Sequence, residues 1–354
     1  MSSSAKEGTR LARLIRMAVP LCRSAERLVP RRGAGAPPTY PDWQIAILIM
    51  VAVLARRKSK SAQYRYLYER RRSLMKQLGM RGFPSRSTYF DRYRRAHGLF
   101  RAAVILQGRC AIRSGLVDPT VVAVDKSMMA AHGPPWSSRR GHRGKRPAGA
   151  DGDAGWGYSA HRNWVYGYSF EVVVSASKGS VVFPLDVSVG SASMSEAKSC
   201  IEKMTRLPPQ TRYVTADAAY DTNAIGQAVE FDDRDRATGR HLICPLQSRA
   251  GKPRVGQYPH RGRREQLRQR RAKRWAFYLS TKGRRLYGRR HKTVEPFNEW
   301  FKAKFELRHR VWHRGLANNA TQIAAAVFAY QLLVRYHHHN GGRNGTIQWI
   351  LDTL

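Results

Sequence analysis

Two short runs of β-branched residues constrain the fold of this chain more than any other feature. They are TVVAVD at 120–125 and RYVTAD at 212–217. Continuous apolar runs of this length predict strands that are buried on both faces. Each run ends in an aspartate, so each strand is expected to deliver its carboxylate, Asp125 or Asp217, to an edge of the sheet.

Other segments extend the pattern around these two strands. FEVVVSAS (170–177) and VVFPLDVSV (181–189) flank a KGS turn and predict a hairpin, and HLICPL (241–246) predicts a last short strand. Helices are predicted at 195–207 and 222–231, and a long loop over the Gly- and Arg-rich stretch 133–157. Three antiparallel strands followed by β–α repeats predict an α/β fold with a mixed sheet.

The segment 41–118 has a helical pattern instead. The apolar run at 43–55 is too short to span a bilayer and predicts a buried helix. Gly79 is expected to end one helix, and Ser85 or Ser87 to cap the next. Two helices joined by a short turn are typical of a helix-turn-helix DNA reader, with Arg86 and Ser87 at the start of the second helix. The alternative is a helical bundle with solvated arginines.

The composition points to an anionic partner. Lys and Arg number 64 against 24 acids, a net charge of +40, which favours nucleic acid. The four cysteines lie far apart in the sequence and have no zinc-site spacing, which fits a reducing cytosol. Residues 251–294 are rich in Lys and Arg and hold one acid, Glu265. We expect this block to be a disordered loop or a surface that lies along phosphates.

A third acid joins the two aspartates. Glu295, in KTVEPFNEW, falls in the first turn of a late helix. Two aspartates and a glutamate would form an oxygen-only site suited to two Mg²⁺ or Mn²⁺ ions. Each acid also has a structural interpretation: Asp125 as a cap, Asp217 as a partner of Arg212, and Glu295 as a charge favoured by the helix dipole.

Two further acids lie near these candidates. Asp221 is expected to cap the helix that follows it. Glu171 lies inside a predicted strand and is a weaker candidate, as an accessory ligand.

Four segments together resemble the DDE transposases of bacterial insertion sequences. They are VVAVDKSMMAAHG, WVYGYSFEVVVS, ADAAYD and VEPFNEWFKAKFEL…VWHRGLANN, and the resemblance spans about 41–336. It implies an RNase H-like sheet flanked by helices, with Asp125, Asp217 and Glu295 as the catalytic and metal-binding triad. It divides the chain into a basic arm (1–40), a helical DNA-binding domain (41–118), a catalytic domain (119–340) with a basic insertion (248–290), and a tail (341–354).

One branch of that family carries a Tyr-Arg-Glu-Lys signature. Glu295 and Lys302 have its spacing, and so do Tyr287 and Arg290 relative to each other. Four residues rather than three separate Arg290 from Glu295. The resemblance implies DNA contacts for these basic and aromatic residues, and Trp275 is a further candidate for stacking on a displaced base. The alternatives are that Lys302 pairs with Glu299 or Glu306 and that Trp275 packs within the protein.

The resemblance implies a transposase that binds the inverted repeats of an insertion sequence and catalyses metal-dependent strand cleavage and strand transfer. Its partners would be double-stranded DNA, both element ends and target, and further copies of itself in a dimer or higher assembly. We expect no membrane association and a cytoplasmic, nucleoid-associated location. A non-catalytic DNA-binding regulator and a nuclease without strand transfer remain as alternatives.

Overall fold

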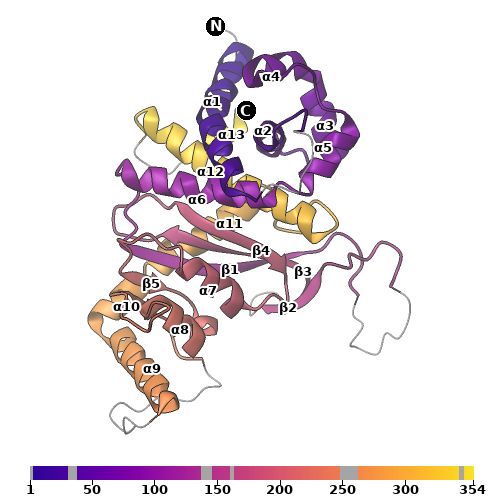
Figure 1. Ribbon diagram of the computed structural model, residues 1–354. Helices are drawn as coiled ribbons and strands as arrows, with labels where there is room; N and C mark the ends of the chain where they lie inside the picture. The colour runs from indigo at the N-terminus through magenta and orange to yellow at the C-terminus, as the bar shows by residue number, and fades with distance from the viewer. Residues whose placement is uncertain (1–2, 31–37, 137–145, 160–162, 248–261, 343–346) are drawn as a thin grey trace.

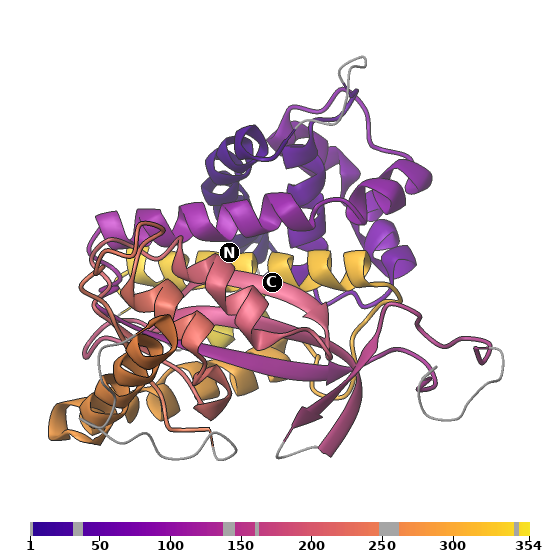
Figure 2. The same ribbon diagram turned by 60° about the horizontal axis from the view of Figure 1, so that its bottom comes forward.

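The computed structural model describes residues 3–30, 38–136, 146–159, 163–247, 262–342 and 347–354. A mixed sheet lies at the centre, with helices on both faces and a helical region beyond one of them (Figures 1 and 2). That region consists of α1 (Ser3–Leu28), α2 (Asp42–Leu54), α3 (Lys60–Glu69), α4 (Arg71–Leu78), α5 (Arg86–Tyr93) and α6 (His97–Arg113). The predicted fold class, a mixed α/β sheet preceded by helices, is confirmed.

The sheet has six strands in a mixed arrangement. They are β1 (Val121–Ala130), β2 (Gly155–Ser159), β3 (Asn163–Ser175), β4 (Pro184–Ser191), β5 (Tyr213–Thr215) and β6 (His241–Ile243). β3 pairs antiparallel with β1 and β4, whereas β1, β5 and β6 run parallel. Apart from β2, which was not predicted, this is the expected order of three antiparallel strands followed by β–α repeats.

Part of the predicted loop 133–157 is a strand. β2 begins at Gly155 and pairs with the first residues of β3, which starts at Asn163 rather than at Phe170. The glycines that suggested a loop allow close packing. A Cβ at Gly157 would lie 2.5 Å from the carbonyl oxygen of Ala192, so only glycine fits there without a shift.

The helices that follow β4 divide between the two faces of the sheet. α11 (Val294–Lys304) packs on β1 and β3, and α12 (Leu316–His339) packs on β4 and beside α6. Phe170 of β3 contacts Phe301 of α11, whereas its neighbour Glu171 reaches Lys203 of α7 (Glu196–Met204) on the opposite face. The remaining helical elements are η1 (Ala218–Tyr220), α8 (Asn223–Glu230), α9 (Arg263–Leu279), α10 (Thr281–Tyr287), η3 (Arg290–Lys292) and α13 (Gln348–Asp352).

Within the predicted basic arm 1–40, residues Ser3–Leu28 form the helix α1. α1 packs against α2 and α6 with one apolar stripe, formed by Leu14, Ala18, Cys22 and Ala25, all buried. Their spacing of three and four residues is helical, but the surrounding arginines obscured it in the sequence. The expected polar tail also contains a helix, α13. Its Ile350 and Leu351 are buried, so this part of the tail packs on the protein.

The local helix signals are confirmed in most places. All of α2 from Trp43 to Leu54 is buried, as predicted. Gly79 ends α4 in the left-handed conformation (φ 63°), and the Ser85 hydroxyl accepts the Thr88 amide at the start of α5. No helix in the described ranges combines the length and apolar character that a bilayer crossing requires.

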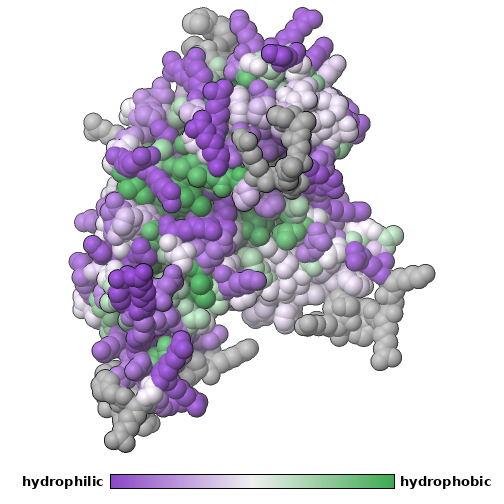
Figure 3. Space-filling view, viewed as in Figure 1, coloured by the Kyte–Doolittle hydropathy of each residue, from purple (hydrophilic) through white to green (hydrophobic). Residues whose placement is uncertain are grey.

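The basic insertion is only partly described, since 248–261 lie outside the described residues. From Arg263 onward it is helical, and hydrophilic residues dominate the surface over α9 (Figure 3). Three of its arginines have carboxylate partners: Arg270 contacts Asp235, Arg271 contacts Asp221, and Arg274 contacts Glu230. The described part of the block is therefore helical and not a disordered loop. Its three paired arginines already bind carboxylates of the protein.

Candidate active site

Asp125 and Asp217 come from neighbouring parallel strands. Ala123 of β1 pairs with Thr215 of β5, and the two strands are parallel. Asp125 and Asp217 each come two residues later, so they lie side by side at the same height of the sheet. Asp217 lies two residues beyond the end of the short β5, and its side chain accepts the Ala219 amide at the start of η1. Asp125 lies within β1, not at its end, because pairing with β3 continues that strand to Ala130.

One arginine joins all three predicted acids. The Arg290 guanidinium contacts Asp125 Oδ1 at 2.6 Å, Glu295 Oε1 at 2.8 Å and Asp217 Oδ2 at 3.9 Å. Its side chain is only 8% exposed, whereas Asp217 and Glu295 are 42% and 41% exposed. The structure thus brings the three candidate acids together on one open side around a buried cation.

The extra residue between Arg290 and Glu295 is absorbed by a change in backbone. Arg290–Lys292 form the short 3₁₀ turn η3, and Thr293, with ψ −78°, leads into α11. Glu295 then falls in the first turn of α11, as predicted, and His291 Nδ1 lies 3.0 Å from its Oε1. The altered spacing therefore does not separate Arg290 from the acids.

Asn298 was missed in the sequence. Its Nδ2 donates to Asp125 Oδ2 at 2.8 Å, and its buried Oδ1 has no hydrogen-bond partner. It follows Glu295 by three residues on α11, so it shares a helix face with that acid, and this spacing was the available signal. Asn298 is therefore a further side chain in direct contact with Asp125.

Burial dominates the electrostatics of Asp125. It raises the pKa of this carboxyl to about 6, and the neighbouring Asp217 and Glu295 charges add to the rise while Arg290 opposes it. Three carboxylates around one guanidinium leave an excess of negative charge. A group with this composition favours an additional cation.

A second set of polar contacts lies beneath Asp217, on the other face of the sheet. Glu171 accepts hydrogen bonds from Lys203 Nζ at 2.6 Å and from the Tyr220 hydroxyl at 2.8 Å. Glu171 is fully buried, so it anchors η1 and is not an accessory ligand at the open site. Asp221 does not cap α8; Thr222 does, and Asp221 instead pairs with Arg271.

The predicted DNA contacts lie in different environments. Arg86 and Ser87 are exposed at the start of α5. Lys302 is buried and pairs with Glu299 at 2.6 Å, which was the alternative interpretation. Trp275 stacks on Tyr278, and Tyr287 packs edge-on against Tyr278 and His291, next to the acids.

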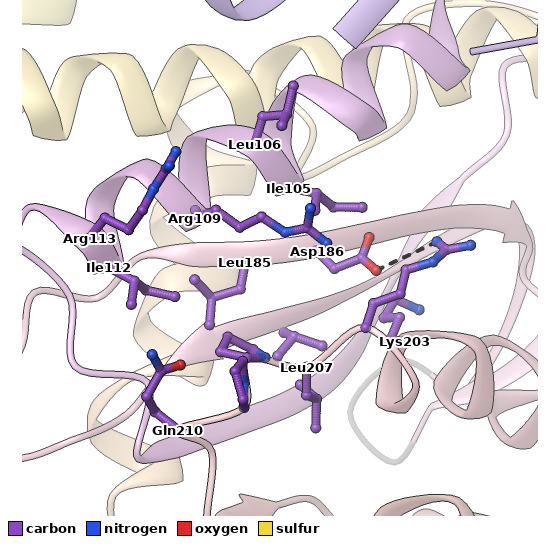
Figure 4. A pocket seen from close by; sticks show the side chains of 15 residues that line it. Ile105, Leu106, Arg109, Ile112, Arg113, Leu185, Asp186, Lys203, Leu207 and Gln210 are labelled. Carbon is purple, nitrogen blue, oxygen red and sulfur yellow. Dashed lines mark ion pairs between the residues drawn. The ribbon is translucent and has the colours of Figure 1, made fainter. Parts of the chain in front are cut away.

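A cavity of about 550 Å³ lies elsewhere, between α6, β4 and the end of α7 (Figure 4). Its walls are mainly apolar, and an ion pair between Asp186 and Arg206, 4.0 Å long, lies along one side. Val173 and Lys203 line it, so it belongs to the α7 face of the sheet. None of the predicted site residues contributes to this cavity.

A mixed sheet with acids converging from two parallel strands and a covering helix defines a candidate phosphoryl-transfer site. The family model described as the transposase DDE domain matches residues 117–332, more than half of the chain. The chain therefore belongs to this family of transposases. Comparisons with curated proteins and with solved structures gave no significant match.

Proposed function

We propose that this transposase binds the inverted repeats of an insertion sequence and uses Asp125, Asp217 and Glu295 to cut and join DNA with a divalent metal. The single observation that carries the proposal is the convergence of the three acids on Arg290. A non-catalytic regulator has no need for an acid-rich, open cluster of this kind.

The donor chemistry fits Mg²⁺ or Mn²⁺. The three carboxylates offer only oxygen atoms, which these hard cations prefer. Within the described residues, no three His, Cys, Asp or Glu side chains form a ready-made metal site. The guanidinium of Arg290 occupies the space between the carboxylates. We therefore expect its ion pairs with them to break when metal ions bind.

The roles of the chain's own residues follow from their positions. Asp125, Asp217 and Glu295 would hold the metal, two ions in all, whose chemistry is to activate water and stabilise the leaving oxygen. Asn298 orients Asp125 through its Nδ2 bond. Arg290, once released from the acids, would pair with a phosphate of the cut strand, with Tyr287 beside it.

DNA binding outside the acids is assigned to exposed basic surfaces. Arg86 and Ser87 at the start of α5 would read the element end, as the helix-turn-helix layout predicts. Trp275 and Lys302 are buried or half-buried, so their DNA roles require a rearrangement of their present packing. Two copies would pair the two ends. Binding to arbitrary duplex should weaken steeply with salt, and a flat salt dependence would remove this phosphate-contact argument.

A cleavage assay separates the candidate functions. The protein is incubated with Mg²⁺ and DNA that carries the inverted repeats flanking its coding sequence. Cutting followed by joining supports a transposase, cutting alone supports a nuclease, and binding without cutting supports a regulator.

Two variants, one in α11 and one just beyond its end, complete the assay. Glu295→Gln should abolish cutting while binding persists. Glu306→Gln makes the same change at an exposed ion pair with Lys58 and should cut normally. Normal cutting by Glu295→Gln would contradict the proposal.

A further inference from the structure

The hairpin of β2 and β3 ends in two exposed aromatic side chains. Tyr158 is 59% exposed and Trp164 is 52% exposed, and they are cross-strand partners with ring centroids 5.6 Å apart. The hairpin projects beyond the body of the sheet (Figures 1 and 2). Two large rings side by side on a projecting strand pair form an apolar surface, hereafter the aromatic tip.

The aromatic tip faces the same side of the sheet as Asp125. Val172 is the cross-strand partner of Asp125, and Trp164 precedes it by eight residues, an even number. Side chains two apart on a strand share a face, and Phe170, between them, packs on α11 of that face. Eight residues span about 27 Å, which equals roughly eight base pairs of B-form DNA.

Basic side chains lie between the acids and the aromatic tip. The chain leaves α11 and bridges to the last residue of β1, where the Val311 amide donates to the Ala130 carbonyl at 2.9 Å. Arg308, His309 and Arg310 are exposed in this segment. A DNA strand that starts at the acids would therefore follow positive charge along β1 toward the hairpin.

The hairpin is held firmly by its own contacts. Trp156 packs on Tyr166 with centroids 5.4 Å apart, and the Tyr166 hydroxyl donates to the Asp151 carbonyl at 2.6 Å. Trp156 Nε1 donates to the Trp136 carbonyl at 3.2 Å. The aromatic tip is thus presented on a braced strand pair, and β3 continues from it to pair with β1, which carries Asp125.

We propose that the aromatic tip, Tyr158 and Trp164, stacks against an unstacked base of the DNA, about eight base pairs from the cut. This inference rests on the proposed function for the position of the DNA. Aromatic rings suit the apolar faces of any base, and the adjacent positive charge suits the backbone beside it. The competing occupant is a second copy of the chain, which would bury the same rings.

The first test measures affinity for a mixed-sequence duplex. Tyr158→Ala/Trp164→Ala should bind at least about fivefold more weakly, with an unchanged slope of affinity against salt because no phosphate contact is lost. Trp164→Phe should retain most of the affinity. Trp349→Ala is the matched control, since Trp349 is 44% exposed on α13, which packs against α12 and not against the sheet's hairpin. Unchanged affinity in the double variant, or a changed salt slope, would overturn the proposal.

The second test begins with the wild-type protein, and this first measurement does not depend on a variant that folds. The fluorescent base 2-aminopurine is placed singly along a duplex that carries the flanking inverted repeat. A fluorescence change confined to about eight base pairs from the cut is expected, and its loss in Trp164→Ala with retention in Trp164→Phe supports stacking. No responsive position, or a change in oligomeric state without a change in DNA affinity, overturns it.

The two proposals fail in different ways. Glu295→Gln should keep the fluorescence response of the aromatic tip while it loses cutting. A wild-type protein that gives the response without cutting refutes the proposed function alone. A protein that cuts without the response refutes the stacking role alone.

Discussion

The two faces of the sheet each carry a group of buried charge, and the groups differ in how they are balanced. On the α7 face, Glu171 and Lys203 are both fully buried and pair one to one. On the α11 face, three carboxylates share Arg290, and two of them are about two-fifths exposed. A closed, neutral pair serves structure, whereas an open group with surplus negative charge is suited to binding a cation.

The largest expected effect comes from removing one charge on the α11 face. Asp125→Asn should reduce strand cleavage on the order of a thousandfold or more, because a ligand and a charge at the reacting centre are lost. The free energy of unfolding at pH 8 should not fall when Asp125 is replaced by Asn. The native pKa of Asp125 lies above its ordinary value, so the ionised form costs stability at that pH. Cleavage kinetics and thermal melting at pH 8 check both, and preserved cleavage would refute the role of Asp125.

The same kind of change on the α7 face should have the opposite consequence. Lys203→Met leaves Glu171 buried without its cation, and the free energy of unfolding should fall by about 3–5 kcal/mol. The double variant Glu171→Gln/Lys203→Met should recover much of that loss. Denaturant titration measures these differences, and a loss below about 1 kcal/mol for Lys203→Met would show that the pair is not the structural element described here.

A smaller effect is expected from Asn298. Asn298→Ala removes the amide that orients Asp125 and should weaken Mn²⁺ binding by about 10–100-fold. Calorimetric titration of Mn²⁺ into the protein measures the affinity. Asn340→Ala, at the end of α12, is the control for losing an asparagine outside the site. Equal affinities in the two variants would remove Asn298 from the site.

The smallest effect is a dependence on pH. The pKa of Asp125 is raised to about 6, so this carboxyl is ionised at pH 8 and protonated below pH 6. A proton competes with a metal for the carboxylate, so Mn²⁺ affinity should fall about fivefold from pH 6 to pH 5 and change little from pH 7 to pH 8. An affinity that is constant from pH 8 to pH 5 would contradict the raised pKa.

The sequence was informative where one local pattern decided the structure. β-branched runs located β1 and β5 with their aspartates, and Ser85 and Gly79 marked helix ends. It misled where two patterns competed. The apolar stripe of α1 was obscured by arginines, and the glycines of β2 were interpreted as a loop although they permit close packing.

Two features of the site depended on tertiary structure. The position of Arg290 among the acids follows from the η3 turn, which spacing alone did not reveal. Asn298 was overlooked because an amide carries no charge pattern, and its contact with Asp125 joins residues far apart in the sequence. The triad itself was predicted from the residues and from the family resemblance, and its catalytic role stays a prediction.

A metal-specificity switch at Asp125 tests the central claim most directly. Asp125→Cys replaces a hard oxygen ligand with a soft sulfur, which Mg²⁺ binds poorly and Mn²⁺ tolerates better. If Asp125 holds the catalytic metal, cleavage by this variant should be lost with Mg²⁺ and restored in part with Mn²⁺, with the fold verified by thermal melting. A folded variant that cuts equally well with both metals would contradict the claim.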